Sequence, residues 1–184
     1  AACLRRLAQI VRERMSDLAE LESAITGRPI REMRAQMSRI PEWLDYFAGI
    51  LLGLEGESNR VKGGFLTYTE YRPIGVCALL TPWNHPVLIL VKKLAAALAA
   101  GNTIVIKPSE LAPVSPLFIA AWSQEAGFPA GTVNVVTGDA QTGAALVSHS
   151  LVSRIDLTGG TATGRRVAAA AAERLVPCTL ELGG

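Results

Sequence analysis

Short apolar segments alternate with helical patterns from Ile74 to the end of the chain, and this alternation restricts the fold more than any other feature. The predicted strands span residues 74–80, 103–106, 132–136, 154–157 and 177–180, and the predicted helices span residues 86–100, 113–126, 142–148 and 160–174. Strands that alternate with helices are joined by right-handed crossovers, which place helices on both faces of a parallel sheet. The sequence therefore predicts an α/β fold with a doubly wound parallel sheet.

The segment before Ile74 has a different pattern. Apolar residues recur at three- and four-residue steps over 4–25 and again over 33–54, which predicts N-terminal helices. Gly27 ends the first helix, and Pro41 kinks or splits the second. Residues 65–72 alternate and are rich in Thr and Tyr, so we expect one extended strand there. The predicted organisation is a helical segment over 1–64, a strand over 65–72 and an α/β domain over 73–184.

Composition excludes several classes of protein. The chain is 49% apolar and 18% charged, as in a folded protein, and its net charge of +2 gives no reason to expect nucleic acid as a partner. No run of about 18 apolar residues predicts a membrane span. The three cysteines are widely spaced and odd in number, so they indicate neither a disulfide framework nor a zinc site, and we expect a reducing, cytoplasmic location. The chain starts without Met and ends on Gly-Gly, so we expect a fragment.

Four polar or glycine-containing segments follow predicted strands. They are Thr81-Pro82-Trp83-Asn84, Lys107-Pro108-Ser109-Glu110, Thr158-Gly159-Gly160-Thr161-Ala162-Thr163-Gly164 and Glu181-Leu182-Gly183-Gly184. Ligands of doubly wound sheets bind at the carboxyl ends of the strands. We therefore expect Asn84, Lys107, Gly160 and Glu181 to share one edge of the sheet.

Two of these segments suit a dinucleotide. Small residues around Gly160 let a pyrophosphate approach the backbone N–H groups at the start of a helix. Glu110 can accept hydrogen bonds from the ribose hydroxyls while Lys107 donates one, and the Glu110 carboxylate would repel a 2′-phosphate, which favours NAD over NADP. A structural glycine turn and a polar surface turn are the alternatives, since the glycine spacing differs from G-x-G-x-x-G.

The other two segments offer catalytic groups. The Asn84 amide could stabilise an oxyanion, although the same residue could simply cap a helix. Glu181, at a strand end beside glycines, could act as a general base or be a solvated loop residue. His85, Ile89 and Lys92 lie on one face of the helix that follows Asn84, which is either a binding surface or a solvated face.

Together, the four segments resemble, in order, the motifs of the NAD(P)-dependent aldehyde dehydrogenase superfamily, over its N-terminal cofactor-binding portion. The resemblance implies a Rossmann-like sheet, NAD as cofactor, and residues 65–72 as part of a β-arm that assembles homodimers or homotetramers. It assigns the oxyanion to Asn84, activation of water to Glu181, and the border of the aldehyde tunnel to the face with His85, Ile89 and Lys92. The imidazole and ammonium on this face favour a polar or anionic aldehyde. The implied cofactor contacts are Thr81, Pro82, Trp83, Lys107, Ser109, Glu110, Gly159, Gly160, Thr161, Gly164 and Leu182.

The family's reaction also needs a nucleophilic thiolate. Cys3 falls in a predicted helix, and Cys77 and Cys178 fall within predicted strands, so none fits this role. The resemblance places the reactive cysteine beyond this chain, in a catalytic domain that is absent here, and we expect the chain alone to be inactive. The alternatives are a non-catalytic nucleotide-binding or structural module and a non-hydrolytic acylating relative. Glu181 counts against a non-hydrolytic acylating relative, because acylating members of the family do without this residue.

Overall fold

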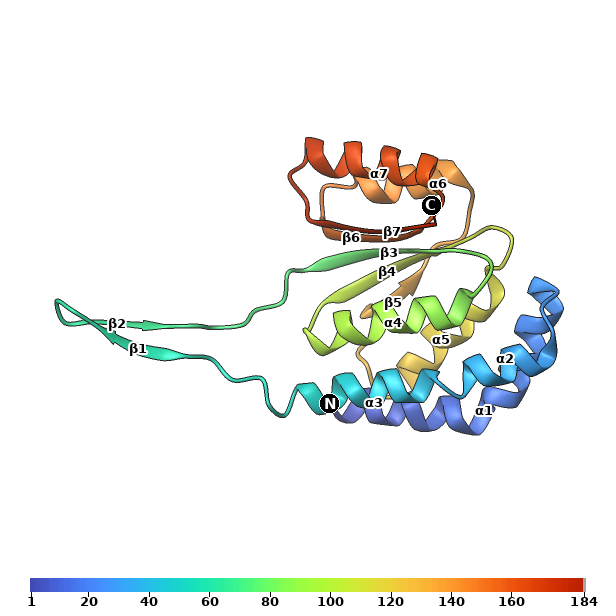
Figure 1. The fold of residues 1–184 in the computed structure, drawn as a ribbon, viewed down its shortest axis with the longest axis horizontal. Helices are drawn as coiled ribbons and strands as arrows, with labels where there is room; N and C mark the ends of the chain where they lie inside the picture. Colours follow the sequence, from blue (N-terminus) through green and yellow to red (C-terminus); the bar gives the residue numbers. More distant parts are fainter. Residues whose placement is uncertain (184) are drawn as a thin grey trace.

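The computed structural model describes residues 1–183, so Gly184 of the last motif lies outside the described residues. A parallel sheet of five strands, in the order β5-β4-β3-β6-β7, forms its centre (Figure 1). The strands are β3 (Val76–Thr81), β4 (Thr103–Pro108), β5 (Val133–Val135), β6 (Val152–Gly159) and β7 (Cys178–Leu182). This confirms the predicted doubly wound sheet. The chain adds strands on one side of β3 and then on the other, so the strand order reverses between β3 and β6.

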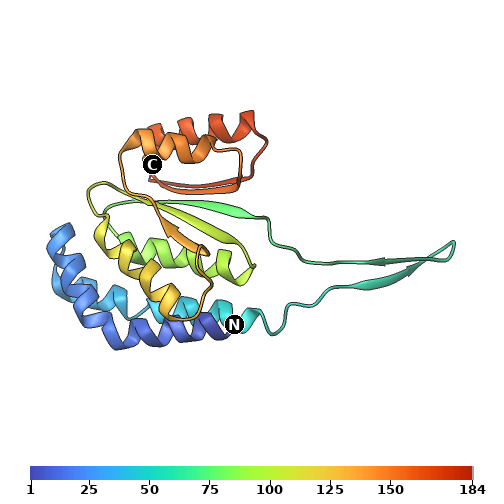
Figure 2. The same ribbon diagram turned by 180° about the vertical axis from the view of Figure 1, so that it is seen from behind.

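Two helices cover each face of the sheet. On one face lie α4 (Pro86–Ala99) and α5 (Val114–Glu125), and on the other lie α6 (Ala140–Ser148) and α7 (Thr161–Glu173) (Figures 1 and 2). Helix α6 starts two residues before the predicted helix, because the Asp139 carboxylate caps it by accepting from the backbone N–H groups of Gln141 and Thr142. Alternate residues of β3 contribute to the two hydrophobic clusters on opposite faces of the sheet.

The N-terminal helices form a third layer beneath α4 and α5 (Figure 1). They are α1 (Ala2–Thr26), α2 (Ile30–Met37) and α3 (Ile40–Ile50). Gly27, with φ of 72°, ends α1 as predicted, and the second apolar stripe is split in two, with Pro41 in the first turn of α3. Among residues 1–183, no helix combines the length and apolarity needed to cross a bilayer.

A two-stranded antiparallel hairpin projects away from these layers (Figures 1 and 2). Its strands are β1 (Ser58–Val61) and β2 (Phe65–Tyr68), and the turn uses Gly63 and Gly64, both with positive φ. Strand β2 is shorter than the strand predicted over 65–72, and β1 was not predicted, because its sequence Ser-Asn-Arg-Val has little apolar alternation. Residue 64, the predicted boundary, lies in the turn of this hairpin.

Candidate functional site

The four motifs meet at the carboxyl edge of the sheet. The register pairs Thr81 of β3 with Pro108 of β4, and Gly159 of β6 with Leu182 of β7. The Ser109 N–H also donates to the Thr81 carbonyl at 3.0 Å, which joins the first two motifs directly. Strands β3 and β6 are neighbours at the point where the strand order reverses, which is where ligands of such sheets bind.

The start of α7 is open toward this edge. Gly160 is the N-cap residue, no side chain caps the helix, and a Cβ atom added to Gly160 would have no heavy atom within 4 Å among the described residues. The first backbone N–H groups of α7 are therefore accessible to an anion. At Gly164, an added Cβ would lie 2.6 Å from Leu182 Cδ2, so this glycine lets α7 pack closely on β7.

Lys107 and Glu110 form a pair at the end of β4. Lys107 is 7% exposed, and its Nζ donates to Glu110 Oε2 at 3.3 Å. The hydrogen bond from Glu110's own backbone N–H, together with the hydrogen bond and charge of Lys107, holds the pKa of the Glu110 carboxyl below its usual value. Glu110 is thus an ionised acceptor at neutral pH. Ser109 Oγ, in contrast, accepts from the Leu111 N–H at 3.3 Å within the same turn.

The last residue of β3 and the three residues after it include both buried and exposed side chains. Thr81 Oγ1 is buried and has no hydrogen-bond partner within residues 1–183. Trp83 is 51% exposed, whereas Pro82 and Asn84 are half-buried. An unsatisfied buried hydroxyl at a strand end is uncommon, and a bound molecule could supply its partner.

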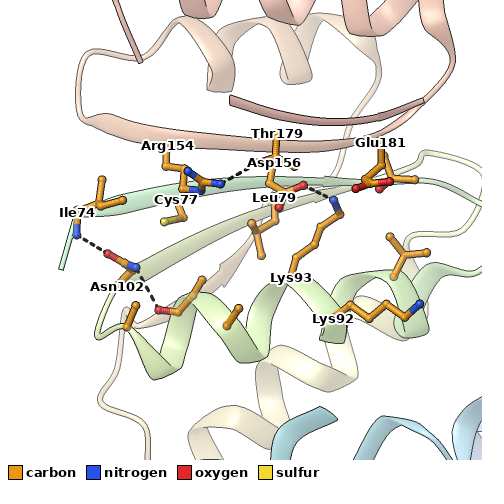
Figure 3. A pocket seen from close by; sticks show the side chains of 15 residues that line it. Ile74, Cys77, Leu79, Lys92, Lys93, Asn102, Arg154, Asp156, Thr179 and Glu181 are labelled. Carbon is orange, nitrogen blue, oxygen red and sulfur yellow. Dashed lines mark hydrogen bonds and ion pairs between the residues drawn. The ribbon is translucent and has the colours of Figure 1, made fainter. Parts of the chain in front are cut away.

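A cavity of about 510 Å³ lies between α4 and the adjoining face of β6 and β7 (Figure 3). Glu181, which is exposed, contributes to its wall. Its lining residues are Ile74, Cys77, Leu79, Ile89, Lys92, Lys93, Ala96, Ala97, Ala100, Asn102, Arg154, Asp156, Thr158, Thr179 and Glu181. The cavity thus brings Glu181 together with Ile89 and Lys92, two of the three residues proposed for the aldehyde tunnel. Asn84 is not among the lining residues, although it follows β3 at the same edge.

Two polar pairs that the sequence did not predict line this cavity. Lys93 of α4 donates to the Asp156 carboxylate of β6, and Arg154 Nη2 donates to Thr179 Oγ1 at 2.7 Å (Figure 3). The sequence holds one sign of such a polar face, because Arg154 and Asp156 are charged residues at alternate positions of β6 and are separated by the apolar Ile155. Alternate residues share one face, so charge there marks an uncovered face.

His85 is oriented differently from the other two proposed tunnel residues. It is absent from the cavity lining, and its Nδ1 lies 2.7 Å from Gln36 Oε1 of α2. Burial is the main cause that lowers the pKa of His85, with a smaller contribution from the positive charge of Arg28. His85 is therefore a neutral imidazole at neutral pH and packs against the N-terminal helices.

The three cysteines are free thiols in three different environments. Cys3 Sγ lies 3.5 Å from the Gly127 carbonyl, and Cys178 is exposed on β7. Cys77 lines the cavity but is 1% exposed, and this burial raises the pKa of its thiol. Because the thiolate is the reactive form, Cys77 is a poor nucleophile where it lies.

Comparison with known proteins shows the family of this chain. The aldehyde dehydrogenase family model matches residues 1–184. A hydroxyisobutyraldehyde dehydrogenase of Mycolicibacterium austroafricanum is 44% identical over 185 residues, which cover 100% of this chain and 37% of that protein. A betaine aldehyde dehydrogenase of Vibrio vulnificus is 41% identical, over 99% of this chain and 38% of that protein. The crystal structure of PnpE, known from Pseudomonas sp. WBC-3, in complex with nicotinamide adenine dinucleotide has a TM-score of 0.94 and 46% identity, over 99% of this chain and 38% of that one. The chain thus spans less than two fifths of the length of these relatives.

Proposed function

This chain belongs to the aldehyde dehydrogenase family, and we propose that it supplies the NAD site and two catalytic side chains of an enzyme that oxidises an aldehyde to a carboxylic acid. One observation carries this proposal. Segments far apart in the sequence, each resembling a family motif, end at the same edge of the sheet, beside a cavity that contains Glu181.

The residues at this edge fit NAD. The uncapped start of α7, with open space at Gly160, suits the diphosphate, and Lys107 and Glu110 suit the adenosine ribose. An ionised Glu110 would repel the 2′-phosphate of NADP, which supports NAD as the cofactor, and the related PnpE binds nicotinamide adenine dinucleotide. Further proposed contacts are Thr81, Pro82, Trp83, Ser109, Gly159, Thr161, Gly164 and Leu182. When bound, NAD would accept a hydride from the substrate.

Asn84 and Glu181 would act on successive intermediates. A cysteine thiolate adds to the aldehyde carbon, and the Asn84 amide donates a hydrogen bond to the oxyanion that forms. After hydride has left this carbon, the resulting thioester is attacked by water, and Glu181 accepts the proton that the water gives up. The carboxylic acid then leaves and the thiolate is restored.

The thiolate in this proposal comes from outside the present residues. Burial raises the pKa of Cys77, Cys3 lies in α1 against Gly127, and Cys178 is an exposed residue at the start of β7. We propose that a catalytic domain in the rest of the protein supplies it. A hydrolytic reaction is favoured over acyl transfer to coenzyme A, because Glu181 lines the cavity and can activate water.

The hairpin supports a proposal about assembly. Val61, Phe65, Leu66 and Tyr68 are large apolar residues between 47% and 71% exposed, on strands with free edges. Such an edge readily pairs with another chain. We propose that β1 and β2 form part of the arm through which complete subunits pair, in a homodimer or homotetramer. We also propose a cytoplasmic location, in keeping with three free thiols.

Glu181→Gln in the full-length protein tests the mechanism. With a saturating aldehyde and NAD, we expect about one NADH per active site in a rapid burst, followed by a steady-state rate about 10²- to 10⁴-fold below that of the wild type. Glu173→Gln, which removes an exposed carboxylate on α7, is the matched control and should leave both phases unchanged. An unchanged steady-state rate in Glu181→Gln would disprove the assignment.

A further inference from the structure

A second cavity, of about 450 Å³, lies between α3 and α4. Its lining residues are Arg39, Glu42, Trp43, Tyr46, Leu88 and Lys92, and we refer to it as the α3–α4 groove. Lys92 also lines the cavity that contains Glu181, so the two cavities adjoin at this side chain.

The aromatic residues of the groove would suit a quaternary ammonium group if they were free. Aromatic faces bind such cations through the ring quadrupole. In this chain, however, Lys92 Nζ lies 5.3 Å from the centroid of the Trp43 ring. The protein's own ammonium therefore occupies the aromatic face that a ligand cation would need.

The charges of the groove favour an anion instead. Arg39 and Lys92 are exposed cations, and Glu42 is the opposing carboxylate, so the lining has a net charge of +1. Within residues 1–183, neither Arg39 nor Lys92 is held in an ion pair. Both are free to donate to a carboxylate, the guanidinium in the bidentate manner that suits this group.

We propose that the α3–α4 groove binds a carboxylate group at the end of the aldehyde remote from the carbonyl, through Arg39 and Lys92, and excludes quaternary ammonium aldehydes. Trp43, Tyr46 and Leu88 provide apolar contacts for the intervening carbon chain. The proposal rests on the proposed function, since it places the reacting carbonyl near Glu181. It also separates this chain from its betaine aldehyde dehydrogenase relatives, whose named substrate has a quaternary ammonium group.

Three aldehydes of similar size test the proposal in the full-length protein: 4-oxobutanoate, butanal and betaine aldehyde. We expect kcat/KM to be highest for 4-oxobutanoate and lowest for betaine aldehyde. Lys92→Met and Arg39→Met should each lower the ratio of kcat/KM for 4-oxobutanoate to that for butanal by about 10- to 100-fold, the effect of losing a hydrogen bond to a charged group. Lys92→Met should also raise the relative rate with betaine aldehyde, because it frees the face of Trp43.

Two controls keep the interpretation specific. Lys92→Arg retains the charge and should retain most of the preference, whereas Arg5→Met removes an exposed cation that does not line the groove and should leave the ratio unchanged. A wild-type protein that prefers butanal or betaine aldehyde, or a preference that survives both Met substitutions, would overturn the proposal.

A binding measurement separates this proposal from the proposed function. Butanedioate, the oxidised form of 4-oxobutanoate, should change the fluorescence of Trp43, and Arg39→Met should weaken this binding by about 10-fold or more. If no aldehyde is oxidised but butanedioate binds in this way, the proposed function fails and the groove assignment stands. If aldehydes are oxidised but butanedioate does not bind in the groove, the groove assignment fails alone.

Discussion

On one face of the sheet, the half formed by β3 and β4 differs sharply from the half formed by β6 and β7, although the pleat is continuous across them. The register aligns Cys77 with Arg154 and Leu79 with Asp156, so these residues point to the same side. In the half formed by β3 and β4, this side presents Cys77, Leu79, Ile104 and Ile106; in the half formed by β6 and β7, it presents Arg154, Asp156, Thr158, Thr179 and Glu181.

The difference arises because helices cover only one of the two halves. The first half is buried under α4 and α5, and its four residues are at most 2% exposed. The second half borders the cavity with Glu181 and is held by the Lys93–Asp156 and Arg154–Thr179 pairs. The covered half therefore stabilises the sheet through apolar burial, while the uncovered half can present charged groups for chemistry.

Truncation of a core residue should reveal the largest difference in stability between the two halves. Ile106, in the covered half, is 0% exposed, so Ile106→Ala should lower the free energy of unfolding by about 2–5 kcal/mol. Thr179→Ala, in the uncovered half, removes one hydrogen bond to Arg154 and should cost about 1 kcal/mol. Urea unfolding midpoints measure both. Equal losses would show that the uncovered half is as tightly packed as the covered one.

Loss of one partner of the Lys93–Asp156 pair should have an intermediate effect. The Lys93 side chain is 7% exposed, and Asp156→Asn leaves its ammonium without a charged partner, so we expect a cost of about 2–3 kcal/mol. The double variant Lys93→Met/Asp156→Asn removes the stranded charge and should regain part of this loss. If the double variant is no more stable than Asp156→Asn in urea unfolding, the pair does not contribute as described.

A carboxyl group within the covered part of the molecule should give a gradual effect, visible as a pH dependence of stability. Glu22 of α1 is 0% exposed and accepts a hydrogen bond from Ser115; burial raises the pKa of Glu22 from 4.5 to about 7. Between these values the folded protein holds a proton that the unfolded chain has released. Stability should therefore fall by about 1 kcal/mol per pH unit as the pH rises through this range.

Glu22→Gln tests this effect, because it removes the ionisation and should flatten the profile of unfolding free energy between about pH 4.5 and 7. Glu13→Gln, which changes an exposed carboxylate on the same helix, should leave the slope of the wild type. A difference in unfolding free energy between the wild type and Glu22→Gln that does not change with pH over this range would contradict the raised pKa.

Much of the site could be predicted because it depends on strand ends. Asn84, Lys107, Gly160 and Glu181 lie at or just after the carboxyl ends of strands whose apolar patterns are clear in the sequence. Parallel strands place these ends along one edge. The cap at Asp139 and the strand β1 were missed because each has a weak local pattern. Pairing with β2 defines β1, whereas the Asp139 carboxylate accepts from backbone N–H groups only two and three residues further along the chain.

The directions of individual side chains could not be predicted in the same way. His85, Ile89 and Lys92 have the spacing of one helix face, yet His85 contacts Gln36 while the other two line the cavity. Likewise, the sequence pattern did not indicate that Gly164 lies against Leu182. Helical spacing places side chains on a face but leaves open which neighbour each of them meets.

The sequence by itself determined the doubly wound sheet, the N-terminal helices and the edge where the four motifs meet. These follow from hydrophobic periodicity and from the chirality of crossovers, which act over a few tens of residues or less. Only the tertiary structure decided that Lys93 pairs with Asp156 and that Lys92 covers Trp43. Such contacts depend on sheet register and helix packing, which bring together residues roughly fifty or more positions apart, and no local pattern encodes them.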